Sequence, residues 1–288
     1  MTIRPRRSAL YMPGSNPRAL AKARTLPADA VILDLEDSVA PDAKSEARAA
    51  VAAAVREGGF GRREVVIRVN AEATEWGRAD LETAAAAGPD AILLPKVSSP
   101  DEIDRVAAAI GGRTQIWAMI ETPLAILRID AIAAAARAGA SPFRCMILGT
   151  NDLAKETRAR MVPGRAPMLP WLTLAVAAAR AHGLDVLDGV YNDLKDPVGF
   201  RAECEQGRDL GMDGKTLIHP DQIGPANEVF APPAAEIEAA RAIIAAFALP
   251  ENRGKGVISL NGRMVERLHA EMAERTVALA DAIAGADA

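Results

Sequence analysis

The feature that most constrains the fold is a regular alternation of short apolar runs with alanine-rich helical segments. Continuous apolar runs of this length are typical of strands that are covered on both faces, as in parallel sheets. The segments between them carry charges at helical spacing, and several end in glycine, the preferred residue just past a helix. The apolar runs lie at residues 8–13, 30–37, 64–70, 91–97, 115–122, 145–152, 185–192 and 214–220.

Eight strand–helix units within about 220 residues are the pattern of a (β/α)8, or TIM, barrel. The alternative is a doubly wound open sheet, and the lack of a GxGxxG motif after the first run argues against it. Beyond residue 220 the pattern changes to a helix, two β-type runs around Asn261-Gly262, which is a strong hairpin signal, and a last helix. We therefore expect an α/β barrel domain at residues 1–230 and a C-terminal helix–hairpin–helix extension at 231–288. This extension would cover the barrel mouth or pack on a neighbouring subunit.

Charge and composition argue against several classes of function. The formal net charge is -4 and no dense basic stripe is present, so we expect no nucleic-acid partner. We expect no membrane span either, because the alanine-rich segments are broken by charges, and the apolar run near the N-terminus is too short for a secretory signal. The two cysteines, Cys145 and Cys204, fit reduced, buried thiols better than a disulfide framework. A cytoplasmic protein is the expectation.

Polar side chains gather where the apolar runs end. In a TIM barrel the active site lies at the carboxyl ends of the strands, so these side chains are the candidates for chemistry. They are Asp34, Glu36, Asp37, Arg68, Asn70, Lys96, Glu121, Asn151, Asp152, Tyr191, Asn192, Lys215 and His219.

Two of these acids, Glu121 and Asp152, end neighbouring strands. Neighbouring strands lie about 4.8 Å apart, so two carboxylates at matching heights can share one cation. Carboxylates without His or Cys partners suit Mg²⁺, which keeps positions for water and substrate oxygens. The alternative is that each acid forms a salt bridge with Arg68 or Lys96. For two acids at adjacent strand ends we favour the metal site.

Four further polar residues have alternative roles. Arg68 lies within an apolar run, so it is a buried counter-ion to the acids after the second run, a ligand for a substrate carbonyl or carboxylate, or both. Glu36 and Asp37 are expected to support the metal ligands rather than to bind the metal directly. His219 precedes a proline, and a structural role fits it at least as well as a catalytic one.

Seven segments of the chain carry a family resemblance. They read RSALYMPGSNPRALAKA, DAVILDLEDSVAPDAKSEAR, VIRVNA, LLPKV, MIETPLAI, LGTNDLAKE and GKTLIHPDQI, in this order over nearly the whole chain. Together they resemble the HpcH/HpaI aldolase and citrate lyase β-subunit superfamily, and within it the CitE-like branch of CoA-ester lyases and malyl-CoA thioesterases. The resemblance implies a TIM barrel whose C-terminal extension covers a neighbour's active site, in a homotrimer or hexamer.

The resemblance also implies roles for individual residues. Glu121 and Asp152 match the family's Mg²⁺ ligands, and Arg68 matches an arginine beside the metal that contacts the substrate oxygens. Asn16 stands where malyl-CoA lyases tend to have arginine. The positions that match the family's pocket for the CoA thioester are Tyr11, Lys22, the backbone at Asn151, Ile218 and His219.

The general base is where this sequence departs from the family. Lyases of the family commonly carry aspartate in a tail motif like GxMID, supplied across the subunit interface. Here the segment reads GRMVERLH, so Glu266 stands in the aspartate's place. A displacement of about one ångström in a catalytic group can cost ~10²-fold in rate. Glu266 is therefore either the general base, the group that activates water against a thioester, or a solvated acid at a helix start.

The resemblance predicts an enzyme, and several reactions remain open. The leading expectation is a Mg²⁺-dependent carbon–carbon lyase that converts a 3-hydroxyacyl-CoA, such as malyl-CoA or citryl-CoA, into a keto acid and acetyl-CoA. The second is hydrolysis of the same thioester. An aldolase that acts without CoA is the third, and the segment LYMPGSNPRALAK argues against it. The non-catalytic alternative is a citrate lyase β-like subunit that works only inside a complex.

Overall fold

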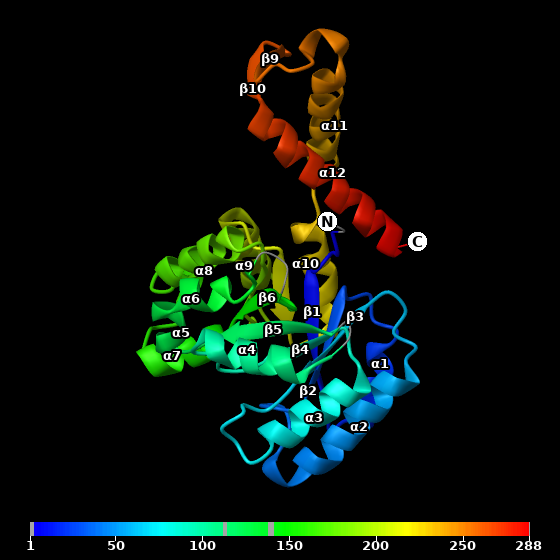
Figure 1. Ribbon diagram of the computed structural model, residues 1–288, viewed down its shortest axis with the longest axis vertical. Helices are drawn as coiled ribbons and strands as arrows, with labels where there is room; N and C mark the ends of the chain where they lie inside the picture. The colour runs from blue at the N-terminus through cyan, green and yellow to red at the C-terminus, as the bar shows by residue number, and fades with distance from the viewer. Residues whose placement is uncertain (1–2, 112–113, 138–140, 288) are drawn as a thin grey trace. The chain divides into compact units, whose positions relative to one another are not determined.

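The computed structural model describes residues 3–111, 114–137 and 141–287. Within these residues, eight strands pair in parallel and close into a barrel in the order β1 to β8, with β8 returning to β1 (Figure 1). This confirms the predicted TIM barrel, and the doubly wound alternative is wrong. The strands are β1 Ser8–Pro13, β2 Ala30–Asp34, β3 Glu64–Arg68, β4 Ala91–Leu94, β5 Gln115–Ile120, β6 Phe143–Leu148, β7 Asp185–Asp188 and β8 Gly214–Leu217.

Helices connect successive strands and cover the outside of the barrel (Figure 1). Most of their buried residues are small or aliphatic, as the alanine-rich sequence predicts. None of the helices in the described ranges combines the length and the apolar character that crossing a bilayer requires. The helices are α1 Pro17–Ala23, α2 Lys44–Glu57, α3 Gly77–Ala87, α4 Pro100–Ala109, α5 Pro123–Leu127, α6 Ile129–Ala134, α7 Thr150–Thr157, α8 Leu169–Ala181, α9 Pro197–Leu210 and α10 Ile223–Phe230.

The predicted runs extend past the strands at their carboxyl ends, except for the first one, which matches β1. The reason is that the runs include polar residues that lie beyond the last backbone pairing. Glu36 and Asp37 follow the end of β2, and Asp152 already belongs to the first turn of α7. These residues therefore sit in the loops that surround the barrel mouth, where TIM barrels carry their active sites.

The two-residue period of the strands decides which side chains face the barrel interior. The interior is an apolar cluster of alternate strand residues: Ala9, Ala30, Ile32, Val66, Ala91, Leu93, Trp117, Met119, Cys145, Ile147 and Leu187. Asp34 comes two residues after Ile32, Arg68 two after Val66, and Glu121 two after Met119. The same period that fills the interior therefore aims these three charged side chains into the mouth.

Arg6 closes the opposite, N-terminal end of the barrel. Its guanidinium donates to both carboxylate oxygens of Glu64, at 2.8 and 2.7 Å, and to Asp185 at 2.5 Å. It also stacks over the Trp117 ring, 4.9 Å from the ring centre. Cys145 and Cys204 are free and buried, as predicted. Arg6 thus links the start of β3 to the start of β7 across this end of the barrel.

Lys215 is not a mouth residue, and grouping it with the polar strand-end residues is wrong. It pairs in register with Ser8 and Asp188, and it is fully buried on the outward side of β8. Its Nζ donates to Asp188 at 3.0 Å and to Glu203 on α9 at 2.7 Å, and Arg165 donates to Asp188 at 2.7 Å. Burial alone would raise the pKa of Asp188, but Lys215 and Arg165 reverse this and hold it below its ordinary value.

The chain forms two compact units, Arg6–Phe230 and Ala231–Ala288 with Met1–Pro5. The second unit contains α11 Ala234–Ala248, α12 Arg267–Asp287 and a hairpin between them. The hairpin pairs β9 Val257–Leu260 with β10 Arg263–Glu266 in antiparallel fashion. Both turn residues have positive φ, 50° at Asn261 and 74° at Gly262, which is why an Asn-Gly pair is favoured there. The unit has a small core of its own: Ala246, Phe247, Ile258, Val265 and Ala270.

We expect Asp188→Asn to lower the free energy of unfolding at pH 7 by about 3 kcal/mol, because it leaves two buried cations without their shared carboxylate. The folded-state pKa of Asp188 is lowered, so its contribution is present above about pH 4 and is lost as the pH falls through the folded pKa. The difference in unfolding free energy between wild type and variant should therefore shrink below pH 4. Urea unfolding at several pH values measures it.

The control for this prediction is Asp209→Asn, which removes an acid paired with Arg208 on the exposed surface. It should leave the unfolding midpoint nearly unchanged at every pH. A loss of stability in Asp188→Asn that is equal at pH 7 and pH 3 would contradict a stabilising role for the buried ion pairs of this carboxylate.

Candidate active site

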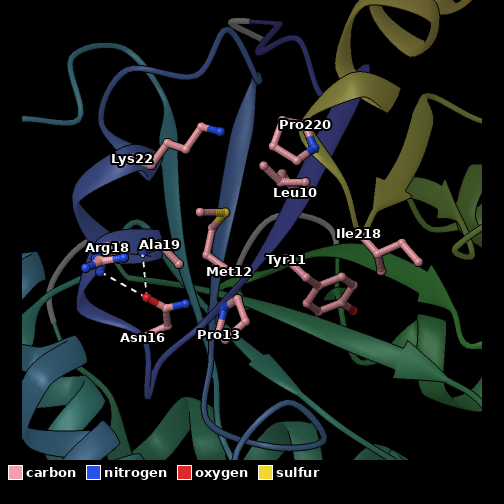
Figure 2. Close-up of a pocket in the computed structure, with 10 residues that line it drawn as sticks. All are labelled: Leu10, Tyr11, Met12, Pro13, Asn16, Arg18, Ala19, Lys22, Ile218 and Pro220. Atoms are coloured by element: carbon pink, nitrogen blue, oxygen red, sulfur yellow. Dashed lines mark hydrogen bonds between the residues drawn. The ribbon is translucent and has the colours of Figure 1, made fainter. Parts of the chain in front are cut away.

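Two adjoining cavities share Tyr11 and Ile218 in their walls. One has a volume of about 300 Å³ and is bounded by β1, α1 and the segment after β8 (Figure 2). Arg18 and Lys22 give it positive charge, and the side chains of both are exposed. Its lining residues are Leu10, Tyr11, Met12, Pro13, Asn16, Arg18, Ala19, Lys22, Ile218 and Pro220.

The second cavity, of about 280 Å³, contains most of the predicted site. It brings Arg68, Glu121 and Asp152 together with Asp34, and Asp37 and Asn151 also line it. Val190, Asn192 and Thr216 complete the wall on the side of β7 and β8. Carboxylates and a guanidinium therefore meet in one recess at the barrel mouth, as the positions of these residues after their strands predict.

Arg68, the last residue of β3, is held by two parallel hydrogen bonds to Asp34 at the end of β2. Its Nε and Nη2 donate to the two carboxylate oxygens at 2.7 and 2.8 Å. Burial alone would raise the pKa of Asp34, but Arg68 holds it below its ordinary value. The third guanidinium nitrogen, Nη1, lies 2.8 Å from a carboxylate oxygen of Glu36 and 3.3 Å from one of Asp37. Such bidentate pairing fixes the plane of an arginine.

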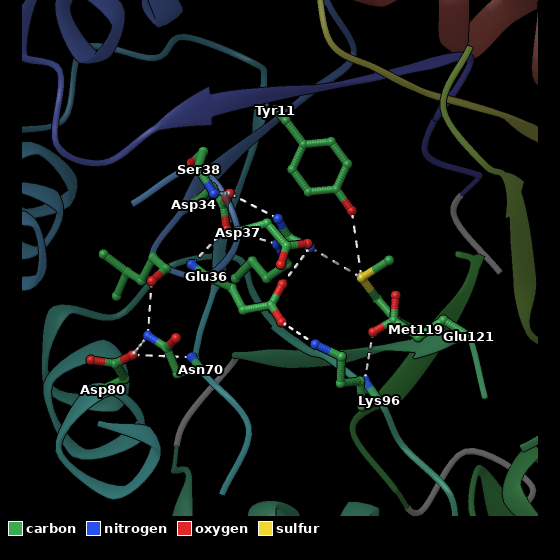
Figure 3. A network of polar contacts seen from close by, with 12 residues as sticks. Tyr11, Asp34, Glu36, Asp37, Ser38, Asn70, Asp80, Lys96, Met119 and Glu121 are labelled. Atoms are coloured by element: carbon green, nitrogen blue, oxygen red, sulfur yellow. Dashed lines mark hydrogen bonds and ion pairs between the residues drawn. The ribbon is translucent and has the colours of Figure 1, made fainter. Parts of the chain in front are cut away.

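Tyr11 packs against the same guanidinium. The Arg68 carbon Cζ lies 4.7 Å from the centre of the Tyr11 ring, which is the geometry of a cation–π contact. The Tyr11 hydroxyl points toward the sulfur of Met119, 3.6 Å away (Figure 3). Burial raises the pKa of Tyr11 well above its ordinary value, so it is a neutral phenol. Tyr11 thus connects the arginine to the wall between the two cavities.

Glu121 directly follows β5 and is nearly completely buried, with 1 % of its surface exposed. Its Oε1 accepts a hydrogen bond from the backbone N–H of Lys96 at 2.7 Å. Burial raises the pKa of Glu121 to about 8, and Glu36 and Asp152 add to the effect, while the Lys96 N–H and Arg68 oppose it. The carboxylate thus lacks enough positive charge around it, and a bound cation would supply that charge.

Room for the Glu121 side chain comes from Gly149, the residue after β6. A Cβ atom at Gly149 would overlap the Glu121 carboxylate and its Cβ. The next residue, Thr150, begins α7, whose first turn carries the half-buried Asp152. Glycine at 149 is therefore required for both acids to face the same cavity.

The donor set of this mouth fits a hard divalent cation such as Mg²⁺. Glu121 and Asp152 offer carboxylate oxygens, and Mg²⁺ characteristically takes one or two carboxylates and completes its shell with water or substrate. Among the residues that the structure describes, no cluster of three or more His, Cys, Asp or Glu side chains has the spacing of a metal site. A protein-only cage is therefore absent there, and any cation at these two acids would share its coordination with other ligands.

Several predicted residues occupy other positions around the two cavities. The Lys96 ammonium pairs with Glu36 at 2.7 Å and not with Glu121, so the expected alternative of a Lys96–Glu121 salt bridge is wrong. Asn16 caps α1 by accepting from the backbone N–H groups of Arg18 and Ala19. His219 caps the short helix Pro220–Gln222, its Nδ1 accepting from the Asp221 N–H at 3.2 Å, which is the structural role considered for it.

Glu266 belongs to the second compact unit and ends β10. Its side chain is half-buried, and its backbone N–H donates to Nδ1 of His269 at 2.9 Å, where α12 begins. The hydrogen bond fixes the backbone at Glu266 and leaves its carboxylate available.

Sequence reasoning missed two supporting residues, Met119 and Gly149, and the backbone conformation of a third, Lys96. The sequence presents Met119 only as part of an apolar run, yet its sulfur lies 3.7 Å from Arg68 Nη1. Gly149 could have been found as a glycine directly after a buried strand. Lys96 has positive φ, 53°, in the loop after β4, and no sequence signal indicates that conformation for a lysine.

Comparisons with known proteins agree with this geometry. The model of the HpcH/HpaI aldolase/citrate lyase family matches residues 7–220. The chain is 52 % identical over 280 residues to a (3S)-malyl-CoA thioesterase of Cereibacter sphaeroides, covering 97 % of this chain and 96 % of that protein. It is 36 % identical over 273 residues to the citrate lyase subunit beta of Escherichia coli, covering 91 % of this chain and 89 % of that protein.

A solved structure extends the likeness to three dimensions. The protein CitE from Mycobacterium tuberculosis, in complex with magnesium, acetoacetate and coenzyme A, superposes with a TM-score of 0.76 at 29 % identity, covering 95 % of this chain and 97 % of that one. With the family match over most of the chain, the chain belongs to the HpcH/HpaI aldolase/citrate lyase family.

Proposed function

We propose that the protein is a Mg²⁺-dependent thioesterase that hydrolyses malyl-CoA or a similar 3-hydroxyacyl-CoA. The observation that carries the proposal is the pair of adjoining cavities: a recess with four carboxylates and an arginine opens beside one that carries positive charge. The 52 % identical relative named (3S)-malyl-CoA thioesterase supports hydrolysis over the other reactions of the family. This choice reverses the order that the sequence alone suggested.

Glu121 and Asp152 are the proposed Mg²⁺ ligands. The neighbouring CitE structure with magnesium supports this assignment, and so does the buried, undercompensated carboxylate of Glu121. When bound, the metal would polarise a substrate oxygen and stabilise negative charge that develops on it. Gly149 and the Lys96 N–H keep Glu121 in place for this purpose.

Arg68 is the proposed ligand for the carboxylate or the hydroxyl oxygen of the acyl group. Its bidentate pair with Asp34 and its stacking on Tyr11 fix the guanidinium before substrate arrives, so little conformational entropy is lost on binding. Glu36 and Asp37 support this arginine from the side.

The charged cavity is the proposed site for the CoA portion. Lys22 offers a mobile ammonium to phosphate groups, and Tyr11 and Ile218 form the apolar wall that both cavities share. The backbone at Asn151 and the Ile218–His219 segment would position the thioester end. A CoA complex of the neighbouring CitE protein supports a CoA ligand for this fold.

Glu266 is the proposed general base that takes a proton from the attacking water. It would be supplied by the extension at residues 231–288, which we propose acts as a lid across subunits of a cytoplasmic homo-oligomer, a trimer or hexamer. Carbon–carbon cleavage remains the second candidate reaction, and the relative named citrate lyase subunit beta supports it. Both reactions require the same metal ligands and the same arginine.

The reaction products distinguish hydrolysis from carbon–carbon cleavage. Purified protein with (3S)-malyl-CoA and Mg²⁺ should release malate and free CoA in equal amounts, with no glyoxylate. Separate assays for free thiol, malate and glyoxylate measure this. Glyoxylate and acetyl-CoA without free CoA would instead establish a lyase and overturn the proposed hydrolysis.

Glu121→Gln should weaken Mg²⁺ binding more than tenfold, since even residues that only support a metal ligand contribute that much. Because burial raises the pKa of Glu121 to about 8, the metal-free wild type carries a proton there at pH 7. Wild type should therefore release close to one proton per Mg²⁺ bound at pH 7, and its affinity should rise with pH until about pH 8. Calorimetry in two buffers of different ionisation enthalpy measures the proton count.

The matched control is Glu82→Gln on the exposed face of α3, which should leave Mg²⁺ affinity unchanged. Wild type that binds Mg²⁺ without releasing a proton at pH 7 would show that Glu121 is not the titrating ligand.

Glu266→Gln should lower kcat by about 10²- to 10⁴-fold, the usual contribution of a general base, with Mg²⁺ affinity unchanged. Glu266→Asp should also be slower, since it withdraws the carboxylate by one methylene. Glu271→Gln, an exposed acid on α12, is the control for charge loss in the same unit. Full activity in Glu266→Gln would make Glu266 an ordinary acid at a helix start.

A further inference from the structure

Lys96, in the loop after β4, has a backbone conformation that lysine rarely adopts. Its φ is 53°, in the left-handed region that favours glycine. Such strained conformations persist only where the surroundings impose them. The contacts of Lys96 therefore need to account for this conformation.

The backbone of Lys96 is tied to the segment that carries Glu121. Its N–H donates to Glu121 Oε1 at 2.7 Å, and its carbonyl accepts from the hydroxyl of Ser98 at 3.2 Å. That hydroxyl lies 3.0 Å from the hydroxyl of Thr122, which caps α5 by accepting from the Ala125 N–H. The left-handed turn at Lys96 thus aims its N–H directly at Glu121 and connects its carbonyl, through the Ser98 hydroxyl, to Thr122, the two residues that follow β5.

The side chain of Lys96 runs to a different group. Its Nζ donates to Glu36 Oε1 at 2.7 Å, and the other oxygen of Glu36 lies 2.8 Å from Arg68 Nη1 (Figure 3). Glu36 is buried, and this second oxygen lacks a well-aligned hydrogen bond within the described residues. Removing the ammonium would leave Arg68 as the one ion-pair partner of the Glu36 carboxylate among the described residues, and the guanidinium would then be drawn away from its place on Asp34.

We infer that Lys96 is a positioning residue with two separate tasks, one performed by its backbone and one by its side chain. The N–H, aimed by the left-handed turn, holds the Glu121 carboxylate in the orientation that binds the cation. The ammonium, through Glu36, holds the Arg68 guanidinium in the orientation that meets substrate. The inference rests on the proposed function, which makes Glu121 a metal ligand and Arg68 a substrate ligand.

The sign of the change in Mg²⁺ affinity distinguishes positioning from a plain charge effect. The Lys96 ammonium interacts electrostatically with Glu121, so removing this positive charge would by itself strengthen cation binding. Loss of the positioned Lys96 N–H would instead weaken cation binding. A variant without the ammonium that binds Mg²⁺ less tightly therefore cannot be explained by charge alone.

The experiment compares Lys96→Met, Lys96→Gly and Lys96→Arg by calorimetric titration with MgCl₂ and by steady-state hydrolysis of malyl-CoA. Lys96→Met loses the anchor of a strained turn, so its Mg²⁺ Kd should rise about tenfold or more, and kcat/KM should fall as well. Lys96→Gly adopts the left-handed turn without strain, so its Kd should stay within about threefold of wild type while kcat/KM still falls at least about tenfold. Lys96→Arg keeps the charge and should recover part of kcat/KM.

Arg78→Met is the matched control, because it removes one cation and one ion pair from the exposed surface of α3. This variant should change neither the Mg²⁺ Kd nor kcat/KM. Thermal unfolding of each variant reports whether it is folded. If Lys96→Met does not fold, Lys96→Gly alone still tests the inference. The inference requires this variant to keep the Mg²⁺ affinity of wild type and to have a lower kcat/KM.

Three outcomes would overturn the inference: unchanged or tighter Mg²⁺ binding in Lys96→Met, equal Mg²⁺ affinities in the Met and Gly variants, or full kcat/KM in Lys96→Gly. Wild type that binds Mg²⁺ but does not turn over malyl-CoA would overturn the proposed function instead, and the order of the Mg²⁺ affinities would still test the backbone task. Wild type that binds no Mg²⁺ would overturn both.

Discussion

The two parallel hydrogen bonds between Arg68 and Asp34 are the interaction on which the mouth of this barrel depends. Both side chains are buried at the ends of adjacent strands, and neither charge would tolerate that burial alone. The register of β2 and β3 sets the two residues side by side, so the pairing of the strands brings the two charges together. The oriented guanidinium then becomes the point to which Tyr11, Glu36 and Asp37 attach.

Negative charge in the mouth exceeds positive charge. In the part of the chain that the structure describes, five carboxylates gather around the cationic side chains of Arg68 and Lys96: those of Asp34, Glu36, Asp37, Glu121 and Asp152. The buried Lys44 ammonium adds a third positive charge near the first three acids. Arg68 and Lys96 engage the first three acids, so Glu121 and Asp152 are left facing the cavity. Burial of Glu121 makes the deficit of positive charge costly, which is the physical basis for expecting a cation there rather than a further salt bridge.

The sequence predicts the site well where a charged residue at the end of a strand also falls on an inward-facing position of that strand. Asp34, Arg68 and Glu121 each continue an inward-facing series of apolar residues, so their direction follows from the pattern. Lys215 shows where this reasoning fails: it lies in the eighth run like a mouth residue, but it falls on the outward face, and its partners Asp188 and Glu203 come from other elements. The left-handed turn at Lys96 was equally beyond sequence reasoning, because tertiary contacts impose it against the residue's own preference.

The barrel by itself does not choose between hydrolysis of a thioester and cleavage of a carbon–carbon bond. Each reaction needs a cation to stabilise charge on oxygen and an oriented arginine to hold the acyl group, and the same side chains offer both. What differs is the proton that a base removes: from water in hydrolysis, or from the substrate hydroxyl in cleavage. Under the proposed function that base is Glu266, whose side chain is one methylene longer than the aspartate that the family resemblance implies at this position.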